Sequence, residues 1–457
     1  MSNLRRLSAV MLCLALVVVV ACALYAAEEE ATKTHKLEYR VVQKAYSDER
    51  GYALVGMGSV EEVEAKDQAL RAEPKYASER LFRGRLELGA DETAAYAVVL
   101  DAANGKGPPC DRLYFDANGD RDLTNDPVIK AAKVKTAELG GVMSFFRPLT
   151  LELPGETGGP YAVTIMAYYV KECPGCGEEH SYAAAGSACY WEGTVQFGDQ
   201  TRRVVLLDGE CNGLFNERNP STIEYPYGYG GDQLLVLADG RKPVKLTPDL
   251  AAQAMPLGRY VRVGDSFYGI EPAPDGSSLK VATREAPTGI LRVNVQHRYR
   301  LQLIGEDGPI TIDCSTPESR LPVGEYLLRE QMVIQTDAKA REWVLETSPT
   351  HSFSLLTGPG EETGMGARPG MLEVTADSKP ELAAFGPPLV VSLDASVTEE
   401  EDEEEKWEVV QIGLSLAGEG GDSVSGILVD GVQPPAPKFR IVSAEGKVVA
   451  EEAFEYG

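Results

Sequence analysis

The chain has 457 residues, 43% of them hydrophobic, and is long enough for about three domains with apolar cores. Its 70 Asp and Glu residues outnumber its 44 Lys and Arg residues, which gives a formal net charge of −26. A chain this acidic repels phosphate backbones, so we expect no nucleic-acid partner. The acidic excess suits divalent cations and cationic partners. It also keeps an exported protein in solution, and charge alone does not decide between these roles.

The N-terminus has the pattern of a secretory signal peptide. Arg5 and Arg6 precede an apolar run over residues 10–23, and acidic residues follow at 28–30. This order is typical of a signal peptide over residues 1–27. We therefore expect an exported protein of bacterial type, either secreted or held in the cell envelope, in the periplasm or at the surface.

The processing of this segment has three possible outcomes. Ala21, Cys22 and Ala23 form an A-x-A cleavage site, which would release the protein. Val19 to Cys22 also resembles a lipobox, which would make the product a lipoprotein with a lipidated Cys22. The third outcome is an uncleaved signal anchor. No other stretch approaches the ~20 apolar residues of a membrane span, so we expect membrane contact only through the signal or a lipid anchor.

The rest of the chain predicts a mainly β, multi-domain fold. Short runs rich in Val, Tyr, Leu and Thr, such as residues 96–101, 161–170 and 194–207, are separated by Gly, Pro, Asp and Asn. This spacing favours antiparallel sheets arranged as sandwiches or barrels. Gly198-Asp199-Gln200 and Pro274-Asp275-Gly276 are expected to be the turns of two hairpins.

Few helices are expected. The strongest signal covers residues 59–73, where Ser59 and Glu62 form a capping box ahead of helix-favouring residues. A short capped helical turn is expected over residues 247–253, with Pro248 at its first position.

Composition divides the chain after the signal peptide into three parts. Residues 28–284 form one or more β-rich domains, and a linker near residues 284–289 separates them from a β-sandwich-like domain over residues 290–370. Residues 371–457 form a C-terminal β domain. This domain contains the acidic run Glu399–Glu405, which we interpret as a solvated loop.

The first acidic loop follows an apolar strand. Oxygen-bearing side chains alternate at Asp116, Asn118, Asp120 and Asp122, and Asp126 follows at the eleventh position. Alternation lets a short loop converge several oxygens on one hard cation, and Ca²⁺ takes six to eight oxygen ligands. The eighth residue is leucine, the apolar residue that anchors a loop of EF type in its core.

The second acidic loop repeats this pattern. Its candidate ligands are Asp208, Glu210 and Asn212, with Gly213 at the sixth position and Phe215 at the eighth. Both loops lack the bidentate Glu that closes an EF-hand at position twelve, and strands flank them in place of helices. The alternative is that Asp and Asn only form Asx-turns, with no ion.

Two resemblances accompany these motifs. The loops D-x-N-x-D-x-D-L-T and D-x-x-x-N-G-x-F, with the F-Y-x-I-x-P-x-P-D-G segment at residues 267–276, resemble uncharacterised exported proteins of environmental bacteria. That resemblance implies one family design for both loops and supplies no activity. The segment at residues 321–328 resembles the strand entry of prealbumin-like and carboxypeptidase-regulatory-like sandwiches, which implies a sandwich in the C-terminal half.

Six cysteines lie beyond the signal region. An even number outside the cytoplasm favours disulfides whose connectivity the sequence does not give. The alternatives are a zinc knuckle, with Cys173, Cys176, His180 and Cys189 as Zn²⁺ ligands, or a redox pair formed by Cys173 and Cys176. The six are Cys110, Cys173, Cys176, Cys189, Cys211 and Cys314.

No catalytic motif is present. The chain has four histidines, none in a metal-binding pair, and no nucleophile elbow, phosphate loop or dinucleotide fingerprint. We therefore expect a non-catalytic binding or structural protein with calcium-type loops and a protein or polysaccharide ligand. The alternatives are an exported hydrolase, a thiol oxidoreductase that uses Cys173 and Cys176, and a zinc-knuckle protein.

Overall fold

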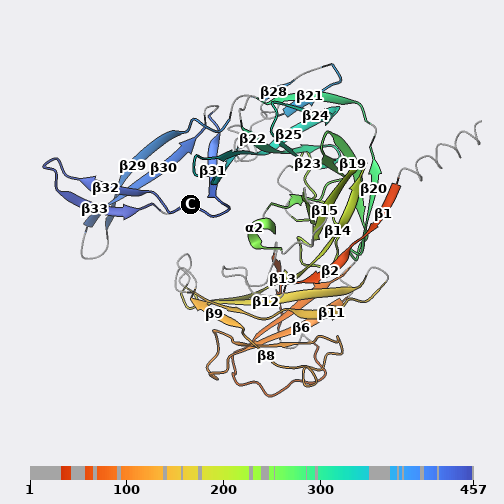
Figure 1. Cartoon of the computed structure of the whole chain (residues 1–457). Coiled ribbons are helices and arrows are strands. Elements are labelled where there is room, and N and C mark those ends of the chain that lie inside the picture. The colour runs from red at the N-terminus through yellow and green to blue at the C-terminus, as the bar shows by residue number, and fades with distance from the viewer. Residues whose placement is uncertain are drawn as a thin grey trace, which may run out of the picture. The chain divides into compact units, whose positions relative to one another are not determined.

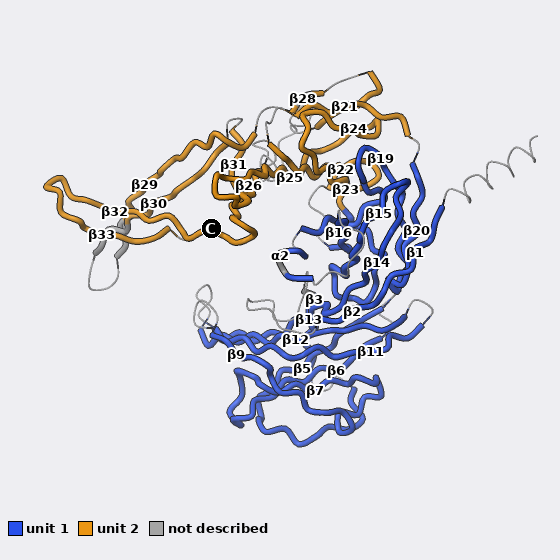
Figure 2. The backbone as a smooth tube through the Cα atoms, in the orientation of Figure 1, with its two compact units in different colours: residues 1–220, 228–284 blue, residues 221–227, 285–457 orange. Residues whose placement is uncertain are grey.

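The computed structural model forms two compact units, the first made of residues 1–220 and 228–284 and the second of residues 221–227 and 285–457 (Figure 2). The predicted signal peptide lies outside the described residues. The structure describes residues 32–42, 57–64, 69–89, 94–136, 141–155, 158–172, 178–225, 230–237, 246–251, 253–284, 286–293, 297–348, 371–377, 380–382, 385–401, 406–418 and 421–454.

The described part of unit 1 contains four antiparallel sheets (Figure 1). The first has the order β1 (Thr32–Lys36), β20 (Ser278–Thr283), β19 (Ser266–Pro272) and β18 (Tyr260–Val263). The second has the order β3 (Met57–Ser59), β13 (His180–Ser187), β12 (Pro160–Val170), β10 (Val142–Phe145) and β9 (Lys133–Thr136), with β11 (Leu149–Glu152) also on β12.

The two remaining sheets carry the acidic loops. One has the order β17 (Met255–Pro256), β16 (Gln233–Leu237), β15 (Gln200–Leu207), β14 (Cys189–Phe197) and β2 (Glu38–Val41). The other has the order β4 (Glu61–Glu62), β5 (Phe82–Leu88), β6 (Ala94–Asp101), β7 (Arg112–Phe115) and β8 (Ile129–Lys130). The first acidic loop leaves the end of β7, and the second leaves the end of β15.

One apolar cluster joins the strands of unit 1. Residues 204–207 at the end of β15 are fully buried, as are Leu113 on β7 and Ile165 on β12. Continuous burial along a strand end means that both of its faces are covered. The strand ends that lead into the acidic loops are therefore held rigidly.

The mainly β prediction is confirmed, including both hairpin turns. Residues 198–199 separate β14 from β15, and residues 273–277 separate β19 from β20. The short helical turn is also found, as α2 (Pro248–Ala251), where the Leu250 amide donates to Thr247 Oγ1 at 3.3 Å. This contact is an N-terminal cap.

The helix predicted over residues 59–73 is wrong. The described residues there form the end of β3 and all of β4, and residues 65–68 lie outside the described residues. Ser59 pairs with Ala184 on β13, and Val60 is buried. Strand pairing and burial have overridden a local capping signal that depends only on sequence spacing.

The largest sheet of unit 2 has eight strands. Seven of them follow in the order β23 (Gly308–Cys314), β22 (Arg298–Gly305), β25 (Gly324–Thr336), β26 (Glu342–Ser348), β31 (Ser423–Val429), β30 (Lys406–Ala417) and β29 (Val390–Glu401). The eighth, β27 (Met371–Val374), pairs with β25. The smaller sheets are β24 (Glu318–Pro322), β21 (Thr288–Val293) and β28 (Glu381–Leu382), and the pair β32 (Lys438–Val442) and β33 (Val448–Ala453). Strands from residues 290–370 and from residues 371–457 share the large sheet, so the predicted boundary at residue 370 does not separate two sheets.

Within the described residues, no helix is long and apolar enough to cross a membrane.

A buried ion pair connects three strands of unit 1. Glu192 on β14 is fully buried, and its carboxylate accepts from Arg203 on β15, with 2.8 Å between Oε2 and Nη2. On the other side, Oε1 accepts from Arg40 Nε on β2 at 2.8 Å. Because Arg203 is also buried, neither of these two charges can return to water without unfolding the sheet.

Replacing this carboxylate should destabilise the fold. Glu192→Gln leaves the Arg203 guanidinium buried against a neutral amide, so we expect the free energy of unfolding to fall by about 3 kcal/mol in urea denaturation. Glu271→Gln removes an exposed ion pair with Lys280 and should change it by about 1 kcal/mol or less. Equal effects from the two variants would contradict this role for Glu192.

Candidate functional site

The first acidic loop is anchored as its sequence predicts. Leu123 is 1% exposed and packs with Val99 and Tyr114, and Phe115 at the end of β7 is 1% exposed. The Leu123 amide also donates to the Ala72 carbonyl at 3.2 Å. The two ends of the loop are therefore held in place, and its acidic side chains start from a rigid base.

Two carboxylates of this loop are incompletely satisfied. Asp116 is fully buried, and its Oδ2 accepts the Arg121 amide at 3.0 Å, whereas its Oδ1 is buried without a hydrogen-bond partner. Asp126 Oδ1 accepts the Ala117 amide at 3.3 Å, and its Oδ2 is likewise buried without a partner. A buried carboxylate oxygen with no donor costs free energy unless a proton or a cation reaches it.

The electrostatics of these two carboxylates agree with their geometry. Burial raises the pKa of Asp116, and the charge of Asp120 raises it further. Burial also raises the pKa of Asp126, with added repulsion from Asp116, Asp120 and Asp122. In the ion-free loop, negative charge is therefore gathered where it is poorly compensated.

The other predicted ligands of this loop face their own amides. Asp120 Oδ2 accepts from Asn125 Nδ2 at 2.7 Å and from Asn118 Nδ2 at 3.0 Å, and the Asn125 contact is the main reason that the pKa of Asp120 is lowered. Asp122 Oδ1 accepts the Thr124 amide at 2.9 Å. The backbone amides of Asp120 and Asp122 also donate to Asn118 Oδ1 at 3.0 Å and to Asp120 Oδ1 at 2.8 Å, and together with the Thr124 contact these are the Asx-turns of the ion-free alternative. The loop thus has an unsatisfied inner pair, Asp116 and Asp126, and a self-satisfied outer set.

The second acidic loop is built differently around Asp208. This fully buried carboxylate accepts the Tyr161 hydroxyl at 2.7 Å through Oδ2. The amides of residues 210–213 also donate to it, the Cys211 amide at 2.6 Å and the Gly213 amide at 2.8 Å among them. Both oxygens are satisfied, which favours the ion-free interpretation at this loop. Phe215 is 1% exposed, as expected of its apolar anchor.

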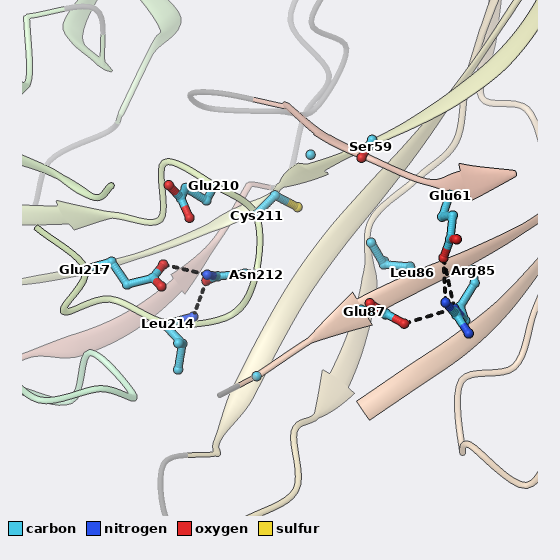
Figure 3. Close-up of a pocket in the computed structure, with 12 residues that line it drawn as sticks. Ser59, Glu61, Arg85, Leu86, Glu87, Glu210, Cys211, Asn212, Leu214 and Glu217 are labelled. Atoms are coloured by element: carbon cyan, nitrogen blue, oxygen red, sulfur yellow. Dashed lines mark hydrogen bonds and ion pairs between the residues drawn. The ribbon is translucent and has the colours of Figure 1, made fainter. Parts of the chain in front are cut away.

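The other candidate ligands of the second loop do not converge with Asp208. Glu210 Oε1 accepts the Gly231 amide at 2.7 Å. Asn212 Oδ1 accepts the Leu214 amide at 2.9 Å, while its Nδ2 donates to Glu217 Oε2 at 2.5 Å (Figure 3). Each side chain closes a separate local contact.

A second buried carboxylate, Asp232, was not identified from the sequence. It is fully buried just before β16, and its two oxygens accept the amides of Gly209 at 3.3 Å and Glu217 at 2.7 Å. Burial raises the pKa of Asp232, and the nearby charge of Asp208 raises it further. Asp208 has more donors than Asp232, so within this pair burial favours the neutral form of Asp232 more strongly. One Asp among 70 acidic residues gave no signal in the sequence.

An open cavity of about 650 Å³ lies between the second loop and the strands β3 to β5 (Figure 3). Its charged lining residues are Glu61, Arg85, Glu87, Glu210 and Glu217. Arg85 is already paired with Glu61 at 2.6 Å and with Glu87 at 2.9 Å, and Figure 3 shows both carboxylates turned toward it. The cavity is acidic, and none of its lining residues is a histidine.

The cysteines that the structure describes are not bonded to one another. Cys110, Cys189 and Cys211 are free, and Cys314 is not bonded to any of them, so the predicted disulfides are wrong for pairs among these four. Three of them are buried in the apolar core as small side chains. Burial raises the pKa of Cys110 and of Cys189 to about 12 and also raises that of Cys211.

Two of the predicted zinc ligands, His180 and Cys189, are not brought together. Cys173 and Cys176 lie outside the described residues. His180 is exposed at the start of β13, whereas Cys189 is fully buried at the start of β14. The eight residues of β13 separate them by about 25 Å, so these two cannot share one tetrahedral site.

The raised pKa of Asp232 predicts a pH-dependent stability. The folded chain holds this proton at pH values where the unfolded chain has released it, so the stabilisation is complete below about pH 4 and is lost as the pH rises through the raised pKa. We expect urea denaturation between about pH 5 and 9 to show a declining stability that Asp232→Asn makes shallower.

The control for this experiment is Asp265→Asn, since Asp265 lies at the surface with its side chain 84% exposed. It should keep the wild-type slope, because this exposed carboxylate is in contact with water in the folded as well as the unfolded chain. Parallel slopes for wild type and Asp232→Asn would contradict a buried proton at Asp232.

In the described part of the chain, no group of three or more His, Cys, Asp or Glu side chains is arranged to hold a metal ion. The chain matches no protein-family model, no curated protein and no solved structure. Its function therefore has to be inferred from the two loops and the cavity.

Proposed function

We propose that this chain is an exported, non-catalytic binding or structural protein of the cell envelope or extracellular space, in which the first acidic loop is ordered by Ca²⁺. Export is inferred from the signal-like residues 1–27. The proposed partner is a protein or a polysaccharide. The calcium role is proposed for the first loop, because the carboxylate of Asp208 in the second loop already has donors for both oxygens.

The observation that carries the proposal is the inner pair of the first loop. Asp116 Oδ1 and Asp126 Oδ2 are buried, lack donors, and belong to carboxylates whose pKa is raised by burial. A divalent cation would satisfy both oxygens and remove the repulsion between the two charges. Calcium suits the position because it accepts several oxygens in flexible geometry.

Binding of Ca²⁺ would require the outer set to rearrange. Asn118 and Asp120 would leave their amide contacts and turn their oxygens toward Asp116 and Asp126. The ion would then tie the end of β7 to the segment before β8, with Leu123 as the fixed anchor. Binding to the folded state alone would stabilise this part of unit 1 by mass action.

Two features support a non-catalytic role. The buried thiols have a raised pKa and stay protonated, whereas nucleophilic cysteines need a lowered pKa. In the described lining of the cavity beside the second loop, each glutamate already has a partner: Glu61 and Glu87 pair with Arg85, Glu210 accepts the Gly231 amide, and Glu217 accepts from Asn212. The thiol oxidoreductase alternative depends on Cys173 and Cys176, which lie outside the described residues.

Calcium should raise the melting temperature of the protein. We expect an increase of several degrees in excess Ca²⁺ over EGTA, measured by differential scanning fluorimetry, and no increase in the double variant Asp116→Asn with Asp126→Asn. In EGTA this double variant should melt no lower than wild type, because it removes buried charge. The calcium response should be smaller near pH 5 than near pH 7.5, because protons compete for these carboxylates.

The matched control is Glu210→Gln in the second loop, which should keep the full response. Mg²⁺ should give little response, since it prefers rigid octahedral sites. An identical melt in Ca²⁺ and EGTA would overturn the proposal. A response that survives in the double variant would place the ion elsewhere and would equally reject this site.

A further inference from the structure

The hairpin formed by β29 and β30 (Figure 1) carries aliphatic residues on one face over residues 391–397 and 410–416, and acidic residues continue that face toward Glu401. Directly opposed residues of antiparallel strands lie on the same face, and alternate residues of a strand share it. The opposed pairs on this face are Val391 with Leu416, Leu393 with Leu414, Ala395 with Ile412 and Val397 with Val410.

This face is largely bare. The exposed fractions of Leu393 and Val397 are 65% and 61%, and those of Val391 and Val410 are 60% and 51%. The remaining large side chains of the face are half-buried. Aliphatic surface of this extent on a sheet is typical of an interaction site.

The opposite face of the hairpin is polar or small over residues 392–396, with the exposed Val390 at its end. Ser392 opposes Ser415, Ser396 opposes Gln411, and Asp394 opposes a glycine. The hairpin is therefore amphipathic, and only one of its faces calls for an apolar partner. β29 is also the last strand in the order of its sheet.

The acidic run Glu399–Glu405 restricts what can cover this face. The end of the hairpin where β29 finishes and β30 begins, called the tip here, is acidic: Glu399–Glu401 are the last residues of β29, and the other four residues of the run follow them in the sequence. The interpretation of the whole run as a loop is therefore wrong for Glu399–Glu401, which pair with β30. A tip with this charge opposes contact with an anionic lipid surface and resists insertion into a bilayer. It also opposes any protein partner that places like charge beside it.

We propose that two copies of this chain pack the aliphatic faces of their β29–β30 hairpins against each other. A two-fold axis near the Ala395–Ile412 pair would place Leu393 of one copy over Val397 of the other. The strands of the two copies then run in opposite directions, so the acidic tips point away from each other. An aliphatic surface is matched by an identical one, and the charge repulsion is minimised.

The area agrees with a specific but moderate interface. Covering the face should remove on the order of 500 Å² from each copy, roughly 1,000 Å² in total, near the lower limit for a specific protein interface. We therefore expect a dissociation constant in the micromolar range, about 1 to 100 µM.

Sedimentation velocity of the purified protein under reducing conditions tests the proposal. Wild type should shift from monomer to dimer across this concentration range, and Leu393→Lys with Val397→Lys should weaken dimerisation by about 100-fold or more. The matched control is Ser392→Lys with Ser396→Lys, which adds the same charge to the opposite face of the same strand. It should leave the dissociation constant within about threefold of wild type.

A second measurement does not depend on the charged variants folding. Ala395→Cys, at the centre of the face, should be joined to its counterpart in the other copy by a bis-maleimide whose span matches the roughly 10 Å between packed sheets. Asp394→Cys, on the polar face, should not. Mass spectrometry of the linked peptides separates these products from links through Cys314, which is partly exposed.

Three results would overturn the proposal. The first is a wild-type protein that stays monomeric at all concentrations. The second is a dimer that the folded lysine variant of the aliphatic face does not weaken. The third is linking through residue 394 in preference to residue 395.

Discussion

A carboxylate that is buried away from water needs hydrogen-bond donors, a guanidinium, a proton or a cation. This constraint applies to every buried carboxylate of unit 1 discussed above. Glu192 meets it with Arg203 and Arg40. Asp208 meets it with four amides and the Tyr161 hydroxyl. Asp232 has two amide donors, and burial and the charge of Asp208 raise its pKa, which favours its protonated form. A chain with 26 more acidic than basic residues cannot give each buried acid its own guanidinium, so other solutions are needed.

The two acidic loops look alike in sequence but differ in this respect. Both start with a fully buried aspartate after an apolar strand, and both end on a buried apolar anchor. The second loop has an outside donor, Tyr161, which lies 47 residues earlier on β12. Asp116 in the first loop has no such donor for Oδ1. The pseudo-repeat therefore describes a shared loop geometry and does not establish a shared ligand, and this difference limits the calcium proposal to the first loop.

Local patterns predicted local structure well in this chain. Gly198 and Asp199 gave a hairpin turn, Thr247 gave a helix cap, and the eighth residues of both loops are buried anchors. The prediction over residues 59–73 failed because a capping box is a local signal. It carries no information about β13, which is distant in sequence and pairs with β3. Asp232 and Tyr161 were missed for the same reason, since their roles arise only when segments far apart in sequence meet.

The disulfide prediction is wrong for pairs among the four described cysteines for a related reason. An even count of exported cysteines favours bridges, but pairing depends on where the strands bring each sulfur. Cys189 and Cys211 serve as small buried side chains beside Tyr161, with their sulfurs accepting the Ala162 amide and the Tyr161 hydroxyl. A predicted cellular compartment is therefore a weak guide to whether a cysteine forms a disulfide, because an apolar core can also bury the free thiol as a small side chain.

In the β29–β30 hairpin the alternation of apolar and polar residues predicts a buried face, but the structure leaves that face exposed. Alternation along each strand defines an amphipathic hairpin in the sequence, and such a pattern is normally maintained by a core on the apolar side. Here the register aligns four aliphatic pairs on one face, yet Leu393 and Val397 stay mostly exposed. A solvated arm would need only polar residues on both faces. The aliphatic face is therefore better explained by a surface that the single chain does not supply, and the acidic tip explains why that surface must approach from the opposite direction.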